Sequence, residues 1–194
     1  MKTKLFCVSA FCLFFATQHS NATETTIACR LEIDKRSFRL GDTIHFKLDY
    51  KNVGSRPLWL VTENETHLAD VFVIRDLAND RKVERIFLPG ETDIAWDVVA
   101  EQAIRLKPNE TVSRVITARI EWQLPPFFGR NTKGVFMVFS GSALELPGIG
   151  NYAIQARFNS SPNSPVTAFL PKHVKLWYGR VLSNVVPITI GSAK

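Results

Sequence analysis

The sequence is poor in the residue types that mark most metalloproteins, disulfide-bonded proteins and enzymes. Its 194 residues include only three cysteines and four histidines. The histidines form neither an HExxH nor a His-x-His pattern, so we expect no bound metal and no cofactor. No P-loop, dinucleotide fingerprint or G-x-S-x-G elbow is present either. We therefore expect a protein that is not an enzyme, although a catalytic triad assembled from distant residues stays open.

Long hydrophobic runs are also missing, except at the N-terminus. Lys2 and Lys4 precede an apolar stretch from Leu5 to Ala16, and Ser20-Asn21-Ala22 supplies the small residues of a cleavage site. This pattern predicts a secretory signal peptide over residues 1–22 and a single mature domain over 23–194. A retained N-terminal anchor is the alternative. Since no later segment approaches ~18 consecutive apolar residues, we expect a periplasmic or secreted protein that does not span the membrane.

The cysteines exclude a disulfide within the mature domain. Cys7 and Cys12 lie in the signal peptide, which leaves Cys29 alone. Thr26-Ile27-Ala28-Cys29 is faintly similar to a lipoprotein cleavage box, so lipid modification of Cys29 is one possibility. The other is a half-buried thiol in the first strand, packed as a small hydrophobic residue. In either case the hydrophobic core has to hold the domain together.

Charge is divided unevenly along the chain. The whole sequence carries a formal charge of +6, and its two halves differ in sign. Residues 23–110 contain 13 basic and 16 acidic residues, whereas residues 111–194 contain 9 basic and 2 acidic residues. This balance indicates an anionic partner rather than a nucleic acid, for which the basic and aromatic residues are too few.

The hydrophobic pattern has a period of two. In Thr43–Lys51, apolar Ile44, Phe46, Leu48 and Tyr50 alternate with polar residues, and turn residues follow at 52–55. Such alternation is typical of a half-buried β-strand. Further strands are predicted over Ala28–Ile33, Leu58–Thr62, Val71–Asp76, Val83–Leu88, Ala103–Leu106, Val112–Trp122, Val135–Phe139, Tyr152–Phe158 and Val181–Ile190. Many short strands and no amphipathic helix predict an all-β antiparallel sandwich.

The order of several short motifs resembles that of bacterial secreted immunoglobulin-like domains. The segments that carry the resemblance are Phe38–Asp42, Ile44–Gly54, Pro57–Leu60, Leu106–Glu110, Gly150–Ala156 and Trp177–Asn184. It implies that Pro57–Leu60 is the third strand of the sandwich and that Tyr152 forms a tyrosine corner. The pattern lacks the paired cysteines of antibody domains, and its connections over 123–149 and 159–180 are unusually long. A looser similarity to BsuPI-type proteinase inhibitor domains lies in the second and third strands.

The two long connections are the candidate binding regions, because loops of more than about 15 residues are commonly functional or disordered. The first combines stiff prolines with aromatic and basic residues, and the second combines cations with an aromatic residue. The predicted partner-binding residues are Pro125, Pro126, Phe127, Phe128, Arg130, Lys172, His173 and Lys175. In the alternative interpretation, Phe127 and Phe128 cap the core, and Trp177 is tucked into the core beneath a solvated basic loop.

Other polar groups have simple structural interpretations. His45 alternates outward on its strand, and Glu63 and Glu65 are typical of solvated turn acids. His67 and Asp70 are close enough in sequence to share a metal only if a third ligand joins them. We therefore predict a non-catalytic, exported binding module of the bacterial envelope that contacts another envelope protein or an anionic surface polymer. The alternative is a secreted proteinase inhibitor with a stiff loop over Leu124–Gly129.

Overall fold

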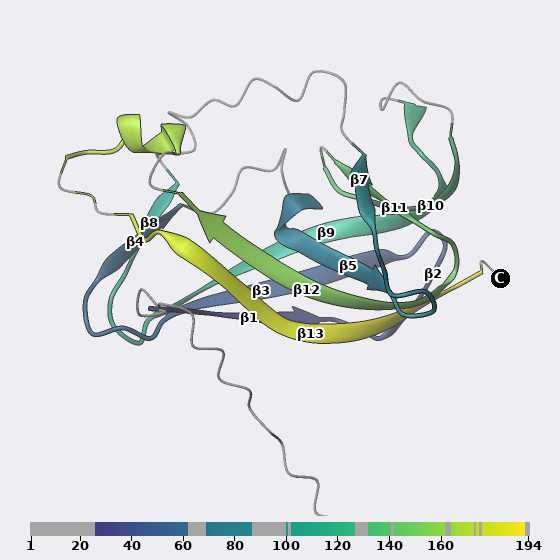
Figure 1. Ribbon diagram of the computed structural model, residues 1–194, viewed down its shortest axis with the longest axis horizontal. Helices are drawn as coiled ribbons and strands as arrows, with labels where there is room; N and C mark the ends of the chain where they lie inside the picture. The colour runs from purple at the N-terminus through teal and green to yellow at the C-terminus, as the bar shows by residue number, and fades with distance from the viewer. Residues whose placement is uncertain are drawn as a thin grey trace, which may run out of the picture.

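The computed structural model describes residues 26–61, 69–86, 100, 102–126, 132–140, 142–161, 164–172, 174 and 176–192. These residues form two large β-sheets and one small one, and the strand pairings are antiparallel with a single exception. The two large sheets pack face to face (Figure 1). The predicted all-β sandwich is therefore confirmed. The predicted signal peptide lies outside the described residues.

The larger sheet has six strands in the order β1-β3-β9-β10-β11-β7. Their bounds are β1 Ile27–Ile33, β3 Thr43–Asn52, β9 Thr111–Gln123, β10 Lys133–Val138, β11 Ala143–Leu146 and β7 Glu84–Ile86. The connection after β9, predicted as a long loop, thus contains two strands that widen this sheet. One of them, β11, has no counterpart among the predicted strands.

The second sheet has five strands in the order β2-β13-β12-β5-β6. Their bounds are β2 Ser37–Arg39, β13 Gly179–Gly191, β12 Gly150–Ser160, β5 Phe72–Asp76 and β6 Arg81–Lys82. The short β2 runs parallel to β13, the one parallel pair among the described strands. The chain leaves β6 at Val83 and enters β7, so this segment crosses from one large sheet to the other.

The segment predicted as the third strand of the sandwich lies elsewhere. Leu58–Val61 forms β4, which pairs with β8 (Ala103–Leu106) in a separate two-stranded sheet and makes an isolated parallel bridge from Trp59 to Leu176. The place beside β12 belongs to β5 instead. The reason lies in its packing, since Trp59 and Val61 pack against a small cluster of Ala100, Val166 and Leu176.

The core lies between the two large sheets. Along β3 every second residue is buried, from Ile44 to Asn52, as the period of two predicts. Aromatic rings fill the centre, where Phe46 and Phe72 have ring centroids 4.4 Å apart and Phe72 and Phe139 lie 5.5 Å apart. Offset and tilted ring pairs of this kind add to the stabilisation from apolar burial. Five of the described phenylalanines, Phe38, Phe46, Phe72, Phe139 and Phe158, thus belong to the main core between the sheets.

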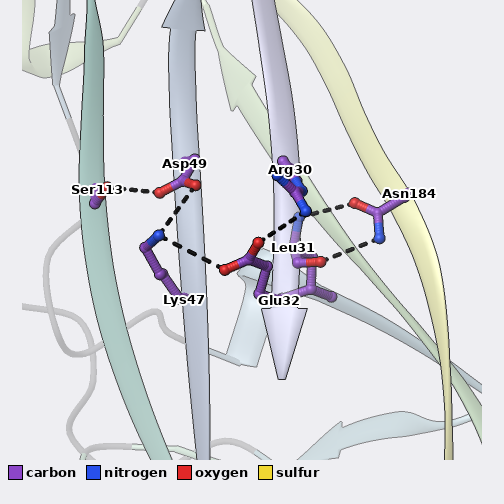
Figure 2. Close-up of polar contacts among 7 residues, drawn as sticks. All are labelled: Arg30, Leu31, Glu32, Lys47, Asp49, Ser113 and Asn184. Atoms are coloured by element: carbon purple, nitrogen blue, oxygen red, sulfur yellow. Dashed lines mark hydrogen bonds and ion pairs between the residues drawn. The ribbon is translucent and has the colours of Figure 1, made fainter. Parts of the chain in front are cut away.

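A side chain joins the two sheets along one open side of the sandwich. Asn184 of β13 accepts a hydrogen bond from Leu31 N (2.9 Å) and donates one to Leu31 O (3.1 Å) (Figure 2). Leu31 lies in β1, the edge strand of the six-stranded sheet. The amide of Asn184 thus satisfies edge backbone groups that would otherwise be open to another strand.

The two long connections lie at opposite ends of the sandwich. Gln123 and Lys133, which flank the first, pair with each other at the end of the sheet where β3 begins. The second follows Ser160 and returns at Gly179, next to β4 and β8 and the end of β3 (Figure 1). It contains a 3-10 helix, η3 (Pro165–Ala168). One partner therefore has to span the whole sandwich to reach both connections.

Candidate functional site

A cavity opens at the end of the sandwich that carries the first long connection. Its volume is about 430 Å³, and its lining comes from the ends of both large sheets. The charged and aromatic lining residues are Arg81, Lys82, Trp122, Lys133 and Glu145. Its floor includes the backbone of Gly134 and Gly148, glycines where an added Cβ would meet only the Phe136 ring at 3.4 Å or nothing within 4 Å.

Trp122 is at the cavity because β9 extends beyond the region where the two sheets cover each other. Ile116, Ala118 and Ile120 face inward at alternate positions and are buried. Trp122 is next in this inward row, yet it is 55% exposed. A large aromatic side chain on an inward row that stays open to solvent is available to pack against a partner.

Arg81 and Lys82 reach the cavity through a tight turn between β5 and β6. The buried Asp76 organises this turn, since its Oδ1 accepts a hydrogen bond from Ala78 N (2.9 Å) and its Oδ2 accepts one from Asn79 Nδ2 (2.8 Å). Asp80 completes the turn in the left-handed region, with φ of 50°. The turn thus holds two consecutive cations at the edge of the five-stranded sheet.

Lys133 enters the cavity from the other side of the first long connection. Leu124 is fully buried, and its N–H donates to Thr132 O (3.1 Å), which closes the base of that connection. Trp122 lies just before this closure and Lys133 just after it. The cavity therefore lies at the foot of the loop that the sequence predicts to bind a partner.

The cations of the cavity carry no ion pair with another described residue. Arg81, Lys82 and Lys133 are exposed, and Glu145 is the one acidic residue among the described residues of the lining. A second hollow, of about 480 Å³, differs in this respect. There Lys35 Nζ lies 2.7 Å from Asp42 Oδ2, and the hydrogen bonds from Lys35 and from Arg39 N lower the pKa of Asp42. Because Asp42 neutralises Lys35, the guanidinium of Arg39 is the one cation left over among the described residues of the second hollow, whereas the first hollow has three cations and one acidic residue.

The predicted tyrosine corner borders the cavity. The hydroxyl of Tyr152 donates a hydrogen bond to Gly148 O and accepts one from Gly148 N (3.3 Å). Burial raises the pKa of this hydroxyl above its usual value. Since Gly148 lines the cavity, Tyr152 fixes the backbone on that side. The tyrosine corner that the family resemblance implies is confirmed.

The predicted partner-binding residues divide between the two ends. Pro125 is half-buried and Pro126 exposed near the cavity, and Lys172 is exposed at the far end. Phe127, Phe128, Arg130, His173 and Lys175 lie outside the described residues. Trp177 is partly buried against the core and stacks on Phe158 with ring centroids 5.5 Å apart. The alternative interpretation, in which Trp177 is tucked into the core, is therefore confirmed.

The sequence placed Trp122 at the end of a predicted strand, directly before the first long connection, but Trp122 and its cationic neighbours were not among the predicted binding residues. Arg81 and Lys82 stand about 40 residues from Trp122 along the chain, and only the fold brings them together. The one local signal was the basic pair directly after Asn79-Asp80, a turn sequence. Nothing in the sequence around Lys133 indicated that this residue belongs to a binding site.

Cys29 and His45 are not among the residues that line this cavity. His45 is exposed on β3, as predicted, and His67 lies outside the described residues. Cys29 is a half-buried free thiol packed against the core, and burial together with the charge of Asp49 raises its pKa to about 11. Among the described residues, no group of three or more His, Cys, Asp or Glu side chains has the arrangement of a metal site. No described helix has the length and apolar character needed to cross a membrane.

No family model and no curated protein matches the sequence. Among solved structures, a β-glucosidase from Erythrobacter marinus is 14% identical with a TM-score of 0.39, covering 85% of this chain and 15% of that chain. A fragment of α2-macroglobulin from Escherichia coli is 15% identical with a TM-score of 0.36, covering 87% and 17%. This chain thus spans less than a fifth of the length of either protein.

Proposed function

We propose that this protein is an exported, non-catalytic binding module of the bacterial cell envelope that recognises an anionic partner at the cavity around Trp122. The observation that carries the proposal is the exposed indole of Trp122 beside three cations without described ion pairs. Aromatic and arginine side chains contribute most of the binding energy at many interfaces. Net positive charge in a concave site attracts anions and speeds their encounter.

Two further observations support this proposal. The described residues that line the cavity include no Ser, Thr, Cys or His, and Glu145 is their one carboxylate, whereas glycoside hydrolysis ordinarily uses a pair of carboxylates. The N-terminal pattern of Lys2, Lys4 and an apolar run over Leu5–Ala16 supports export. Export would bring the cavity into contact with envelope polymers and proteins, many of which are anionic.

A pair of charge reversals tests the proposal. Lys133→Glu reverses one charge in the cavity. Lys51→Glu reverses one charge at an exposed residue near the end of β3, at the other end of the sandwich. We expect Lys133→Glu to weaken binding of anionic ligands by at least about tenfold, or about 1.4 kcal/mol, whereas Lys51→Glu leaves it unchanged. Titration calorimetry at two salt concentrations measures both effects. Equal losses in the two variants would show a diffuse effect of net charge instead of a site.

Proteinase inhibition is the second candidate, and one observation favours it. The buried Leu124 and its hydrogen bond to Thr132 O hold the base of the connection that contains Pro125 and Pro126. A loop anchored at its base and stiffened by prolines loses little entropy when it enters a protease cleft. Titration of a panel of proteases with the mature protein tests this function. Any protease that keeps its full activity in a stoichiometric excess of the mature protein is not inhibited by it.

A further inference from the structure

We infer that the ligand of this cavity is an acidic saccharide, a sugar unit that carries hydroxyl groups and one or two carboxylate, sulfate or phosphate groups. The inference rests on the proposed function, because it names the chemical class of the anionic partner. Its basis is the combination of indole, cations and a single carboxylate in one small cavity. Each of these three features selects a different part of such a ligand.

The size of the cavity favours a compact ligand over a broad protein surface. Its volume of about 430 Å³ falls within the range of small-molecule pockets, about 300–1,000 Å³. An extended peptide would need a strand edge to pair with, as in β-augmentation. The edge strand at this site, β6, has only two residues. A peptide would therefore find few backbone partners here.

Trp122 selects for an apolar surface on the ligand. Its side chain is 55% exposed. Burial of the indole against apolar atoms of a ligand contributes a binding free energy of about 25 cal/mol per Å² of apolar surface removed from water. A sugar ring presents such a surface, since the C–H groups on one face of the ring are apolar while its hydroxyls point to the rim. Inorganic polyphosphate has no apolar face to offer.

The charges of the cavity match a ligand of low charge density. Arg81, Lys82 and Lys133 contribute three positive charges, and Glu145 contributes one negative charge, which leaves a net charge of +2 on the described residues of the lining. Arginine binds carboxylate, sulfate or phosphate oxygens through two parallel hydrogen bonds. One or two anionic groups on the sugar unit that occupies the cavity therefore balance this charge.

Glu145 favours the binding of saccharides over the binding of other anions. An ionised carboxylate only accepts hydrogen bonds, and it repels a second anion placed close to it. A sugar hydroxyl donates to it without bringing further charge. A ligand with densely spaced charges, such as polyglutamate, would meet repulsion at Glu145. Recognition of hydroxyls beside an acidic group is thus the chemistry that this set of residues provides.

The experiment compares matched ligands by titration calorimetry with the mature protein. The acidic saccharides are tetragalacturonate, a sulfated mannobiose and a phosphorylated mannobiose, whose anionic groups are carboxylate, sulfate and phosphate respectively. Fully methyl-esterified tetragalacturonate keeps the rings and removes the charge. A tetraglutamate peptide keeps the carboxylates and removes the rings.

We expect at least one acidic saccharide to bind with a dissociation constant of about 1 mM or lower and the neutral ester to bind at least about tenfold more weakly. Trp122→Ala and Lys133→Glu should abolish this binding, whereas Trp122→Phe keeps part of it and Lys51→Glu leaves it intact. Glu145→Leu should weaken saccharide binding and strengthen tetraglutamate binding. Unchanged melting temperatures of the variants confirm that each is folded.

Two results would overturn the inference, and they are distinguishable. If tetraglutamate binds at the cavity as tightly as every saccharide, the ligand class is wrong while the proposed anion-binding function stands. If none of the anions binds, or if Lys51→Glu weakens binding as much as Lys133→Glu, both the inference and the proposed function fail.

Discussion

Asn52 shows how one polar side chain is fitted into the core of this protein. It is fully buried at the end of β3, and its Nδ2 donates to Arg56 O (2.9 Å) and Leu106 O (3.1 Å). Its Oδ1 accepts a hydrogen bond from Gly54 N (2.9 Å). One amide thereby ties β3, the turn that follows it and the end of β8 together.

Replacement of Asn52 tests this role. Asn52→Ala leaves two backbone carbonyls and one N–H without their partner, and we expect the free energy of unfolding to fall by about 2–3 kcal/mol. Asn159→Ala, which truncates an exposed asparagine of β12, should change it by less than about 0.5 kcal/mol. Urea unfolding of both variants measures the difference. Equal effects would mean that the hydrogen bonds of Asn52 contribute nothing specific.

Cys29 should be unreactive in the folded protein at neutral pH. Its pKa is raised from 9.0 to about 11, so the reactive thiolate is scarce until the pH approaches 11. The unfolded chain loses the thiol proton at lower pH, so the contribution of Cys29 to stability is complete below pH 9 and is lost between pH 9 and about 11.

Alkylation by iodoacetamide, followed by mass spectrometry over pH 7 to 12, checks this expectation for the mature domain. The rate for folded protein should rise with an apparent midpoint near 11, and the rate in urea should rise with a midpoint near 9. Cys29→Ser supplies the blank. A folded-state midpoint at or below 9 would show that Cys29 is more open to solvent than its packing indicates.

At the scale of strands, the hydrophobic period predicted the long elements well. Thr43–Lys51 and Val112–Trp122 match β3 and β9 to within a residue at each end, because the apolar positions of both segments alternate. The short strands β2, β6 and β11 were not predicted, since so few residues rarely show a period. The segment of β4 was predicted as a strand, but the family resemblance wrongly placed it as the third strand of the sandwich.

The contact between Asn184 and β1 protects an exposed sheet edge. Around it, the outer face of the six-stranded sheet carries paired charges, with Lys47 Nζ 3.6 Å from Glu32 Oε2 and 3.4 Å from Asp49 Oδ2 (Figure 2). Surface pairs of this kind contribute little to stability but keep the face polar. The edge itself depends on the two hydrogen bonds between Asn184 and Leu31.

Asn184→Ala should expose the N–H and C=O of Leu31 to other molecules. We expect it to lower the free energy of unfolding by about 1–2 kcal/mol and to promote dimers or larger species through edge pairing. Light scattering after size-exclusion chromatography, over a range of protein concentrations, detects the association. Asn159→Ala serves as the control. A variant that stays as monodisperse as the control would show that the edge is protected by other means.

For the whole molecule, the charge asymmetry along the sequence does not become an asymmetry in space. Each large sheet contains strands from both halves, and the cavity itself combines Arg81 and Lys82 from the acidic half with Lys133 from the basic half. From the sequence we predicted an anionic partner and the connection beside which the site lies. The sequence could not predict the site itself. Arg81 and Lys82 lie just before the segment that crosses between the sheets at Val83, Lys133 follows the hydrogen bond between Leu124 and Thr132, and only the fold brings these three charges together.

The two long connections also have separate roles at this scale. The second packs against β4 and β8 through Val166 and Leu176 and holds Trp177 against the core. The first closes at Leu124 beside the cavity. We therefore expect binding to depend on the end of the sandwich with Trp122 and not on Lys172.

The most direct test of this account is an NMR titration of the isotopically labelled mature protein with an acidic saccharide such as tetragalacturonate. We predict that the indole N–H of Trp122, assigned with the Trp122→Phe variant, and the amides of Gly134 and Gly148 shift together and saturate. Amides beside Lys172 at the opposite end should stay unchanged. Shifts confined to the end with Lys172, or no shifts at millimolar ligand, would contradict the account.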